Sequence, residues 1–355
     1  MSKKTLILTL IIASLFLTLF ARYNLSFAES YALYVYPVFS ETISSFSSKF
    51  SFSLAEYLIL TAITVLVVYF IVVFVMTIRD MSLVYFKDFV INLSLFISII
   101  YFLFALFCGL NYHRYEFTYY SKLAIEPSTK EQLVKLNELL IDDANEKRAS
   151  METGKNTAKL FDHNHMGTTR RAKESMDKLS KKYDVLKGNF AEPKMVKASK
   201  LMSHMRITGV FFPFTFEANV NKDIPPYQLP STMLHELVHL RGFMREDEAN
   251  FIAYLASVNS GFDDFAYSGT MLALSHSMTA LYREDKDEYA RLYNMYSDKV
   301  KMDLKYSRDY WSNYTTKVAG ISNKVNDTYL KANNQQDGVK SYGRMVDLLL
   351  AYYND

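Results

Sequence analysis

Two histidines and four acidic residues lie within eighteen positions, in the stretch LHELVHLRGFMREDEANF (residues 234–251). His235 and His239 are four residues apart, so on a helix they share a face and can bind one ion through their imidazole nitrogens. Glu236 follows the first histidine, where its carboxylate can take a proton from water held by that ion. This HExxH pattern is typical of zinc peptidases. The sequence therefore predicts His235 and His239 as Zn²⁺ ligands and Glu236 as the catalytic base.

A third ligand is required, because zinc in enzymes binds three side chains and keeps its fourth position for water. Suitable carboxylates follow Gly242, which is expected to end the first helix. Glu246 and Asn250 share a face of the next helix, so the Asn250 amide could hold a ligand histidine in place. Glu248 points about 160° away from Glu246, at roughly 100° per residue. We therefore favour Glu246 as the third metal ligand and keep Glu248 as the alternative.

Short elements on either side are expected to position these side chains. Pro230 suits the first turn of a helix through HELVH, and a second helix is expected at about 246–258. Before them, residues 206–221 are rich in β-branched and aromatic residues. Pro213 confines a strand there to a sheet edge or splits it. The pattern indicates two helices that follow an edge strand.

The chain before this strand is expected to be helical. After Pro127, Ser128 and Thr129 can cap a helix, and a polar helix is expected at about 168–187. We predict a mainly α fold with a small β element (α+β). It would comprise a helical extracytoplasmic segment at 111–205 and a domain with the zinc site at 206–355.

Three apolar runs occupy the first third of the chain, at about 5–21, 55–78 and 89–110. A helix needs about 20 apolar residues to cross the hydrocarbon core, so residues 1–110 are predicted to form a membrane domain with three transmembrane helices. The first run also has features of a signal peptide, but its length and flanks favour an uncleaved anchor.

The positive charges beside these runs predict the orientation in the membrane. Lys3 and Lys4 precede the first run, and Arg79 and Lys87 lie between the second and third. Lysine and arginine favour the cytoplasmic side. We therefore expect a multi-pass protein of the cytoplasmic membrane with its N-terminus inside and the part after about residue 111 outside.

Composition narrows the remaining possibilities. The formal net charge of +3 is close to balanced, so no nucleic-acid partner is expected. Cys108 is the only cysteine, which excludes an intrachain disulfide and a cysteine-cluster zinc site. His163 and His165 in the sequence DHNH are interpreted as surface residues rather than ligands.

Three stretches together resemble an uncharacterised family of bacterial membrane proteins, a domain of unknown function with zinc-metalloprotease-like motifs. They are ITGVFFPFTFEANVNKDIP, LPSTMLHELVHLRGFMREDEANFIAYLA and NDTYLKANNQQDGVKSYGRMVDLLLAYY. The site is also similar, more distantly, to gluzincins whose second motif reads ExxAD or ExxAN. Examples are the prenyl-protein (CAAX-type) zinc proteases and the ImmA/IrrE-like peptidases.

This resemblance implies a zincin-like domain in which Glu246 of the sequence EDEAN is the third ligand. Only six residues separate His239 from Glu246, fewer than in those relatives, so the turn at Gly242 must be tight. The resemblance also implies that a strand at 209–219 pairs with an extended peptide substrate. A donor to the transition-state oxyanion is expected too, with three candidates of which none is singled out: Tyr254, His276 and Arg344.

Two hypotheses follow. The first is a membrane-anchored zinc metalloendopeptidase that hydrolyses peptide bonds of proteins or peptides outside the cytoplasmic membrane. The alternative is a non-catalytic envelope binding protein, a pseudoenzyme with a structural metal site. A structural zinc site normally has four protein ligands, and the sequence offers no obvious fourth one, which favours the enzyme.

Overall fold

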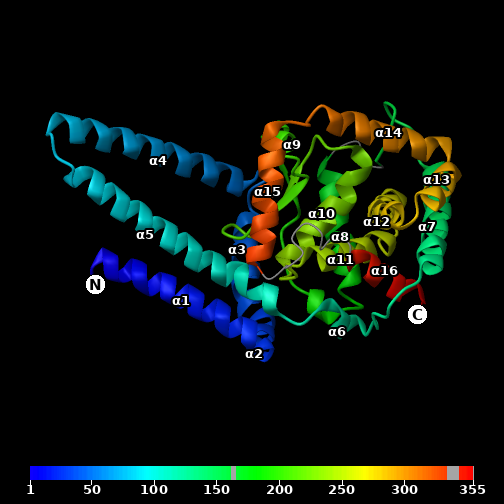
Figure 1. Cartoon of the computed structure of the whole chain (residues 1–355), viewed down its shortest axis with the longest axis horizontal. Coiled ribbons are helices and arrows are strands. Elements are labelled where there is room, and N and C mark those ends of the chain that lie inside the picture. Colours follow the sequence, from blue (N-terminus) through cyan, green and yellow to red (C-terminus); the bar gives the residue numbers. More distant parts are fainter. Residues whose placement is uncertain (161–164, 334–343, 355) are drawn as a thin grey trace.

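Three long apolar helices project from one side of a globular part (Figure 1). The computed structural model describes residues 1–160, 165–333 and 344–354 of the chain. The helices are α1 (Lys3–Tyr23), α4 (Leu54–Arg79) and α5 (Val84–Phe107), and each is long and apolar enough to cross a membrane. The three predicted spans are thus confirmed, although the third begins and ends a few residues earlier than expected.

The positions of the ends of these three helices show which segments of the chain lie on the same side of a membrane that the helices cross. The N-terminus and the α4–α5 connection lie at the far ends of the helices, away from the globular part (Figure 1). The end of α1, the start of α4 and the end of α5 all join the globular part. Residues 24–53 and the described residues after Phe107 therefore lie together on one side of the bilayer. That this side is extracytoplasmic remains a prediction.

The segment between α1 and α4 is helical and belongs to the globular part. It forms α2 (Leu25–Ser30), the π-helical turn η1 (Tyr31–Val35) and α3 (Tyr36–Ser47). The Tyr36 hydroxyl donates to the carbonyls of His239 and Leu240, at 3.1 and 3.2 Å, and Tyr36 is buried. This segment therefore supports the end of the helix that carries the histidines.

A small sheet of three strands lies beside that helix. Its strands are β1 (Lys194–Val196), β2 (Gly209–Phe212) and β3 (Glu217–Asn221), in the order β1-β3-β2. β3 pairs in parallel with β1 and antiparallel with β2. The expectation of one strand at 209–219 was wrong: the chain turns after Pro213, and residues 217–219 belong to the buried central strand. Only β2 offers a free edge in this region.

The remaining elements are helices around one hydrophobic core, which confirms the mainly α fold with a small β element. α7 (Lys130–Ser150) begins with the expected cap, because Thr129 and Gln132 form a reciprocal capping box. α12 (Asp263–Glu284) packs against α7, α10 and α11. The core takes residues from both the 111–205 segment and the described residues of 206–355. The other helices are α6 (Phe117–Ser121), α8 (His165–Leu179), α9 (Ser199–His204), α10 (Leu229–Leu240), α11 (Glu246–Val258), α13 (Lys286–Met295), α14 (Asp298–Ser312), α15 (Lys317–Ala332) and α16 (Arg344–Asn354), with 3₁₀ turns η2 (Gly109–His113), η3 (Asp184–Leu186) and η4 (Pro226–Gln228).

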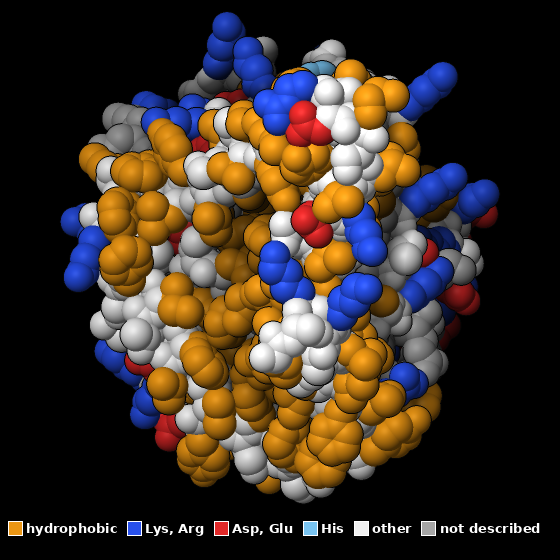
Figure 2. All heavy atoms as spheres, turned by 90° about the vertical axis from the view of Figure 1, so that its left-hand side faces the viewer, with side chains coloured by type: hydrophobic (Ala, Val, Ile, Leu, Met, Phe, Trp, Pro, Cys, Tyr) orange, Lys and Arg blue, Asp and Glu red, His pale blue; other side chains and the backbone are white. Residues whose placement is uncertain are grey.

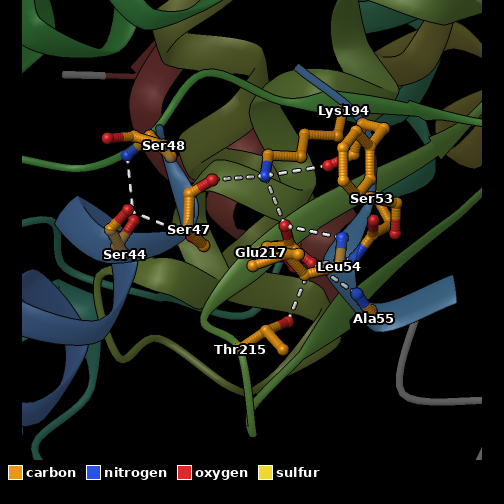
Figure 3. Close-up of polar contacts among 12 residues, drawn as sticks. Ser44, Ser47, Ser48, Ser53, Leu54, Ala55, Lys194, Thr215 and Glu217 are labelled. Atoms are coloured by element: carbon orange, nitrogen blue, oxygen red, sulfur yellow. Dashed lines mark hydrogen bonds and ion pairs between the residues drawn. The ribbon is translucent and has the colours of Figure 1, made fainter. Parts of the chain in front are cut away.

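A buried ion pair fastens the start of α4 to this sheet (Figure 3). The Glu217 carboxylate accepts the backbone N–H groups of Leu54 and Ala55, at 3.1 and 2.8 Å, and the Thr215 hydroxyl at 2.8 Å. Lys194 pairs with Glu217 and also donates to two backbone carbonyls of the chain just before α4. Glu217 and Lys194 are both buried, so their charge-assisted hydrogen bonds join the start of the second span to the sheet.

Candidate metal centre

The helix pair α10 and α11 carries the predicted ligands. Pro230 lies in the first turn of α10, as expected from its fixed φ and missing N–H. Gly242 has φ +82°, and a Cβ there would lie 3.1 Å from the Tyr36 ring and 3.3 Å from Arg114. Glycine therefore permits the tight turn that brings α11 back beside α10.

Three potential ligand atoms converge between these helices. His235 Nε2 lies 3.0 Å from His239 Nε2 and 3.2 Å from Glu246 Oε2. His239 Nε2 lies 3.7 Å from Glu246 Oε1, and the three atoms that could serve as ligands all lie within 4.8 Å of one another. Two imidazoles and one carboxylate at this spacing form a donor set that suits Zn²⁺.

The second nitrogen of each imidazole is already engaged. His235 Nδ1 lies 2.9 Å from Asn250 Oδ1, and His239 Nδ1 lies 2.8 Å from the Phe243 carbonyl oxygen. A carbonyl oxygen only accepts, so each Nδ1 carries the proton and each neutral ring presents its Nε2 lone pair to the other. At 3.0 Å these two lone pairs would repel each other unless a proton or a metal ion lies between them. The residues present therefore fit a bound cation, and Asn250 orients His235 as the sequence predicted.

The pKa values of the histidines reflect the same crowding. Burial, together with the positive charge of the neighbouring His235, lowers the pKa of His239 to about 4. Burial also opposes the charging of His235, but the hydrogen bond and charge of Glu246 outweigh it and raise that pKa to about 9. Without a metal the cluster thus holds one proton, which a divalent cation would replace.

Glu236 lies on the floor of the cleft, beneath the edge strand. Its side chain is buried, it accepts the backbone N–H of Phe211, and burial raises its pKa to about 8, with a smaller contribution from Glu246. Gly209 on β2 leaves room for it, because a Cβ there would lie 2.4 Å from Glu236 Oε1. This glycine was not identified from the sequence, since its role depends on the close approach of β2 to α10.

Glu248, the alternative ligand, points elsewhere. It accepts the backbone N–H of Phe117 at 2.5 Å and pairs with Arg245 at 3.4 Å. It is buried in contact with the segment that follows the third span, away from the two imidazoles, and it is not part of the cluster. Its role is to hold that segment against α11.

The three candidates for an oxyanion donor do not line the cleft. Tyr254 shares a hydrogen bond with the Tyr353 hydroxyl at 2.7 Å, and Arg344 pairs with Asp247 at 3.2 Å. His276 lies on α12, also away from the residues that line the cleft. His163 and the side chain of His165 lie outside the described residues.

The cluster of His235, His239 and Glu246 opens into a cleft of about 550 Å³ between β2 and α15. Two tyrosines that the sequence did not single out line it, Tyr112 after α5 and Tyr329 on α15, with their hydroxyls 3.1 Å apart. Burial raises the pKa values of both tyrosines, and the negative charge of Glu246 raises them further. For Tyr329 the sequence contained one signal of a functional role: the residue lies in NDTYLKANNQQDGVKSYGRMVDLLLAYY, the third stretch that carries the family resemblance.

Most of the chain matches one protein family. The family described as "Protein of unknown function (DUF3810)" matches residues 31–350. The chain belongs to the DUF3810 family. This part of the DUF3810 protein contains two of the three spans, the sheet and the metal centre. The expected resemblance to an uncharacterised family is confirmed, while the zinc-peptidase character remains a prediction. No curated protein and no solved structure matches the chain.

Proposed function

We propose that this DUF3810 protein is a membrane-anchored, zinc-dependent metallopeptidase. One observation carries the proposal: His235, His239 and Glu246 converge within 4.8 Å, in a cleft that also holds the buried carboxyl of Glu236. A zinc ion bound there would act as a Lewis acid on a water molecule and on the scissile carbonyl. Few other uses account for two imidazoles and two carboxyls gathered in one cleft, two of them buried and two partly buried.

Glu236 would transfer protons. Burial raises its pKa to about 8 in the site without a metal, and the positive charge of a bound zinc ion would lower that pKa toward neutral pH, where a carboxyl can both accept and donate a proton. It would take the proton of the attacking water and return it to the leaving amine. The N–H of Phe211 holds the carboxylate, and Asn250 keeps His235 oriented.

The surroundings of the cluster favour an extended substrate. β2 forms one side of the cleft and has no strand on its free edge, so a peptide could add to it as a further strand. The cleft also shares residues with a second hollow of about 920 Å³, among them Arg206, Thr208 and Asn323. The second hollow contains five tyrosines, which suit apolar or aromatic peptide side chains: Tyr227, Tyr282, Tyr289, Tyr293 and Tyr296.

The alternative is a non-catalytic binding protein with a structural metal. Such a site would close all four metal positions with protein ligands. Among the described residues, three side chains of the metal-binding types gather at the cluster: His235, His239 and Glu246. One position would be left for water or substrate, so the enzyme is the better proposal.

We further propose that the catalytic part lies outside the cytoplasmic membrane. Lys3, Lys4, Arg79 and Lys87 stand at the far ends of the spans, which suits the cytoplasmic side. Alkaline phosphatase fused after the last residue should be active in intact cells, because it folds only outside the cytoplasm. An inactive fusion, with activity from a cytoplasmic reporter, would reverse the orientation.

The test of the function uses the full chain in lipid nanodiscs. Wild-type protein should contain one zinc ion per chain by elemental analysis and should cleave members of a peptide library, and a chelator should stop the cleavage. Glu236→Gln should retain zinc and lose cleavage, whereas His239→Ala should lose both. Cleavage that survives in Glu236→Gln would refute the assignment of the base. A zinc-loaded wild-type protein that cleaves no peptide would favour the binding protein.

A further inference from the structure

α15 is a helix with little packing of its own. Within its described residues, only Ala319 and Leu330 are buried, and most of its other side chains are exposed. In Figure 1 it runs across the direction of the spans, on the side of the globular part from which they leave. Figure 2 looks onto this side with the spans pointing toward the viewer, and hydrophobic side chains, including those of the spans, cover much of the view.

The exposed apolar residues of α15 form a stripe. Val318, Ile321 and Val325 are 50%, 63% and 63% exposed, which is costly in water for side chains of this size. At roughly 100° per residue, these three together with Tyr329 and Ala332 fall within about 80° of the helix circumference. The buried Ala319 and Leu330 point in a different direction, toward the protein. The stripe therefore lies on a different face of the helix from the two side chains that pack into the core.

The position of Tyr329 fixes the depth of this stripe relative to the spans. Its ring lies 6.0 Å from the ring of Phe104, in the last turn of span α5, and its hydroxyl lies 3.6 Å from Cys108 Sγ at the end of that span. α15 thus meets α5 where α5 leaves the hydrocarbon core. A helix that crosses the span direction at this level lies in the interface between lipid and water.

The charges of α15 suit a negatively charged lipid surface. Lys317, Lys324 and Lys331 are exposed and spaced by seven residues, so they form a row beside the apolar stripe. Asp327 is the one acidic residue of the helix, and it pairs with Lys331 at 2.7 Å. An apolar stripe bordered by lysines is the pattern of a helix that lies on an anionic bilayer.

The same helix forms a wall of the metal cleft. Val325, Asn326 and Tyr329 line the cleft together with the two ligand histidines. Val325 and Tyr329 therefore belong both to the stripe and to the cleft wall. If the stripe lies in the interface, the cleft opens at the level of the lipid headgroups.

We propose that the apolar stripe of α15, made of Val318, Ile321, Val325, Tyr329 and Ala332, binds the headgroup region of an anionic bilayer. It thereby presents the metal cleft to peptide segments that emerge from the same membrane. The proposal that α15 binds lipid depends only on the position of the helix, its apolar stripe and its lysines, and not on the proposed function. The substrate class, membrane-anchored proteins cut close to the bilayer, rests on the proposed function.

Lipid contact is tested without activity. Ile321→Cys, labelled with an environment-sensitive fluorophore, is placed in nanodiscs of phosphatidylcholine and phosphatidylglycerol with and without brominated lipid. Cys108 is buried and should remain unlabelled. Leu139→Cys on α7, 45% exposed and remote from the spans, is the matched control. The label at 321 should lose most of its fluorescence to the brominated lipid and the label at 139 should keep it. Equal fluorescence loss at the two positions would overturn the proposal.

The substrate class is tested by comparing one peptide in two forms, tethered to the nanodisc by a lipid anchor and free in solution. Val318→Glu/Ile321→Glu should lower cleavage of the tethered peptide about tenfold, the effect of losing roughly one partly buried apolar side chain. The Val318→Glu/Ile321→Glu variant should cleave the free peptide at the wild-type rate. The control variant Leu139→Glu should cleave both forms of the peptide at the wild-type rate. An unchanged tethered rate would overturn the inference. Absence of cleavage by wild type in both forms would refute the proposed function but leave the quenching result intact.

Discussion

A single added methyl group should disable the proposed catalytic base while sparing the metal ligands. Gly209 begins β2 and lies against Glu236. In Gly209→Ala the new Cβ would lie 2.4 Å from Glu236 Oε1 and 2.8 Å from its Cγ, whereas ordinary contacts begin at 3.4 Å. The carboxylate must therefore retreat by about 1 Å, and a misplacement of that size costs on the order of 100-fold in rate.

Three measurements on the full chain in nanodiscs separate the possible outcomes. The kcat/KM for a cleaved peptide should fall about 100-fold in Gly209→Ala, with zinc content unchanged. The free energy of unfolding should fall by about 1–3 kcal/mol, the usual effect of overpacking a buried contact. Gly320→Ala is the matched control, because nothing lies within 4 Å of a Cβ at that position, and it should behave as wild type.

Two results would refute this reasoning. A Gly209→Ala protein with wild-type kcat/KM would show that the position of Glu236 beneath β2 does not matter for turnover. A Gly209→Ala protein that loses its zinc would show that β2 supports the ligands rather than the base. Either result is interpretable only if Gly320→Ala retains activity and zinc.

Three further predictions test other parts of the structure. Glu246→Ala should abolish zinc binding, whereas Glu248→Ala should keep the zinc content and lower only the stability, and equal zinc loss in the two variants would contradict the ligand assignment. Arg148→Met should lower the free energy of unfolding in denaturant by about 3–5 kcal/mol, because its fully buried partner Asp303, at 2.6 Å, keeps an uncompensated charge; a change within experimental error would show that the pair is dispensable. Burial lowers the pKa of His113 from its ordinary 6.5 to about 4, so the unfolded chain binds a proton more readily and the thermal unfolding midpoint should fall as the pH drops from 6.5 toward 4. His113→Gln should flatten that decline, and an identical pH profile would show that another group causes it.

The features that the sequence predicted well depend on local signals. The three spans follow from runs of apolar residues, and α11 begins and ends where the sequence placed it. Pro230 and Gly242 mark the start and end of the α10 region because each meets a backbone requirement that few other residues satisfy. The choice of Glu246 over Glu248 needed only the helical repeat.

The features that the sequence did not reveal depend on contacts between distant segments. Tyr112 and Tyr329 meet across 217 positions, and nothing in the local pattern of either residue marks it as part of the cleft. For residues 206–221 the sequence left open whether Pro213 places a strand at an edge or splits it, and only the pairing of β2 with β3 shows that the chain forms a hairpin there. No pattern in residues 24–53 indicated a role near the histidines, yet Tyr36 supports the end of α10.

The junction of Lys194 and Glu217 with the start of α4 limits how the globular part can be excised for biochemical work. A fragment that starts at residue 111 would lack the N–H groups of Leu54 and Ala55, and Glu217 would lose two of its donors. It would also lack the two carbonyls that receive Lys194, and the Tyr36 hydroxyl beneath α10. Soluble truncations should therefore misfold or aggregate unless they carry residues 24–58 joined by a linker across the deleted hairpin of spans.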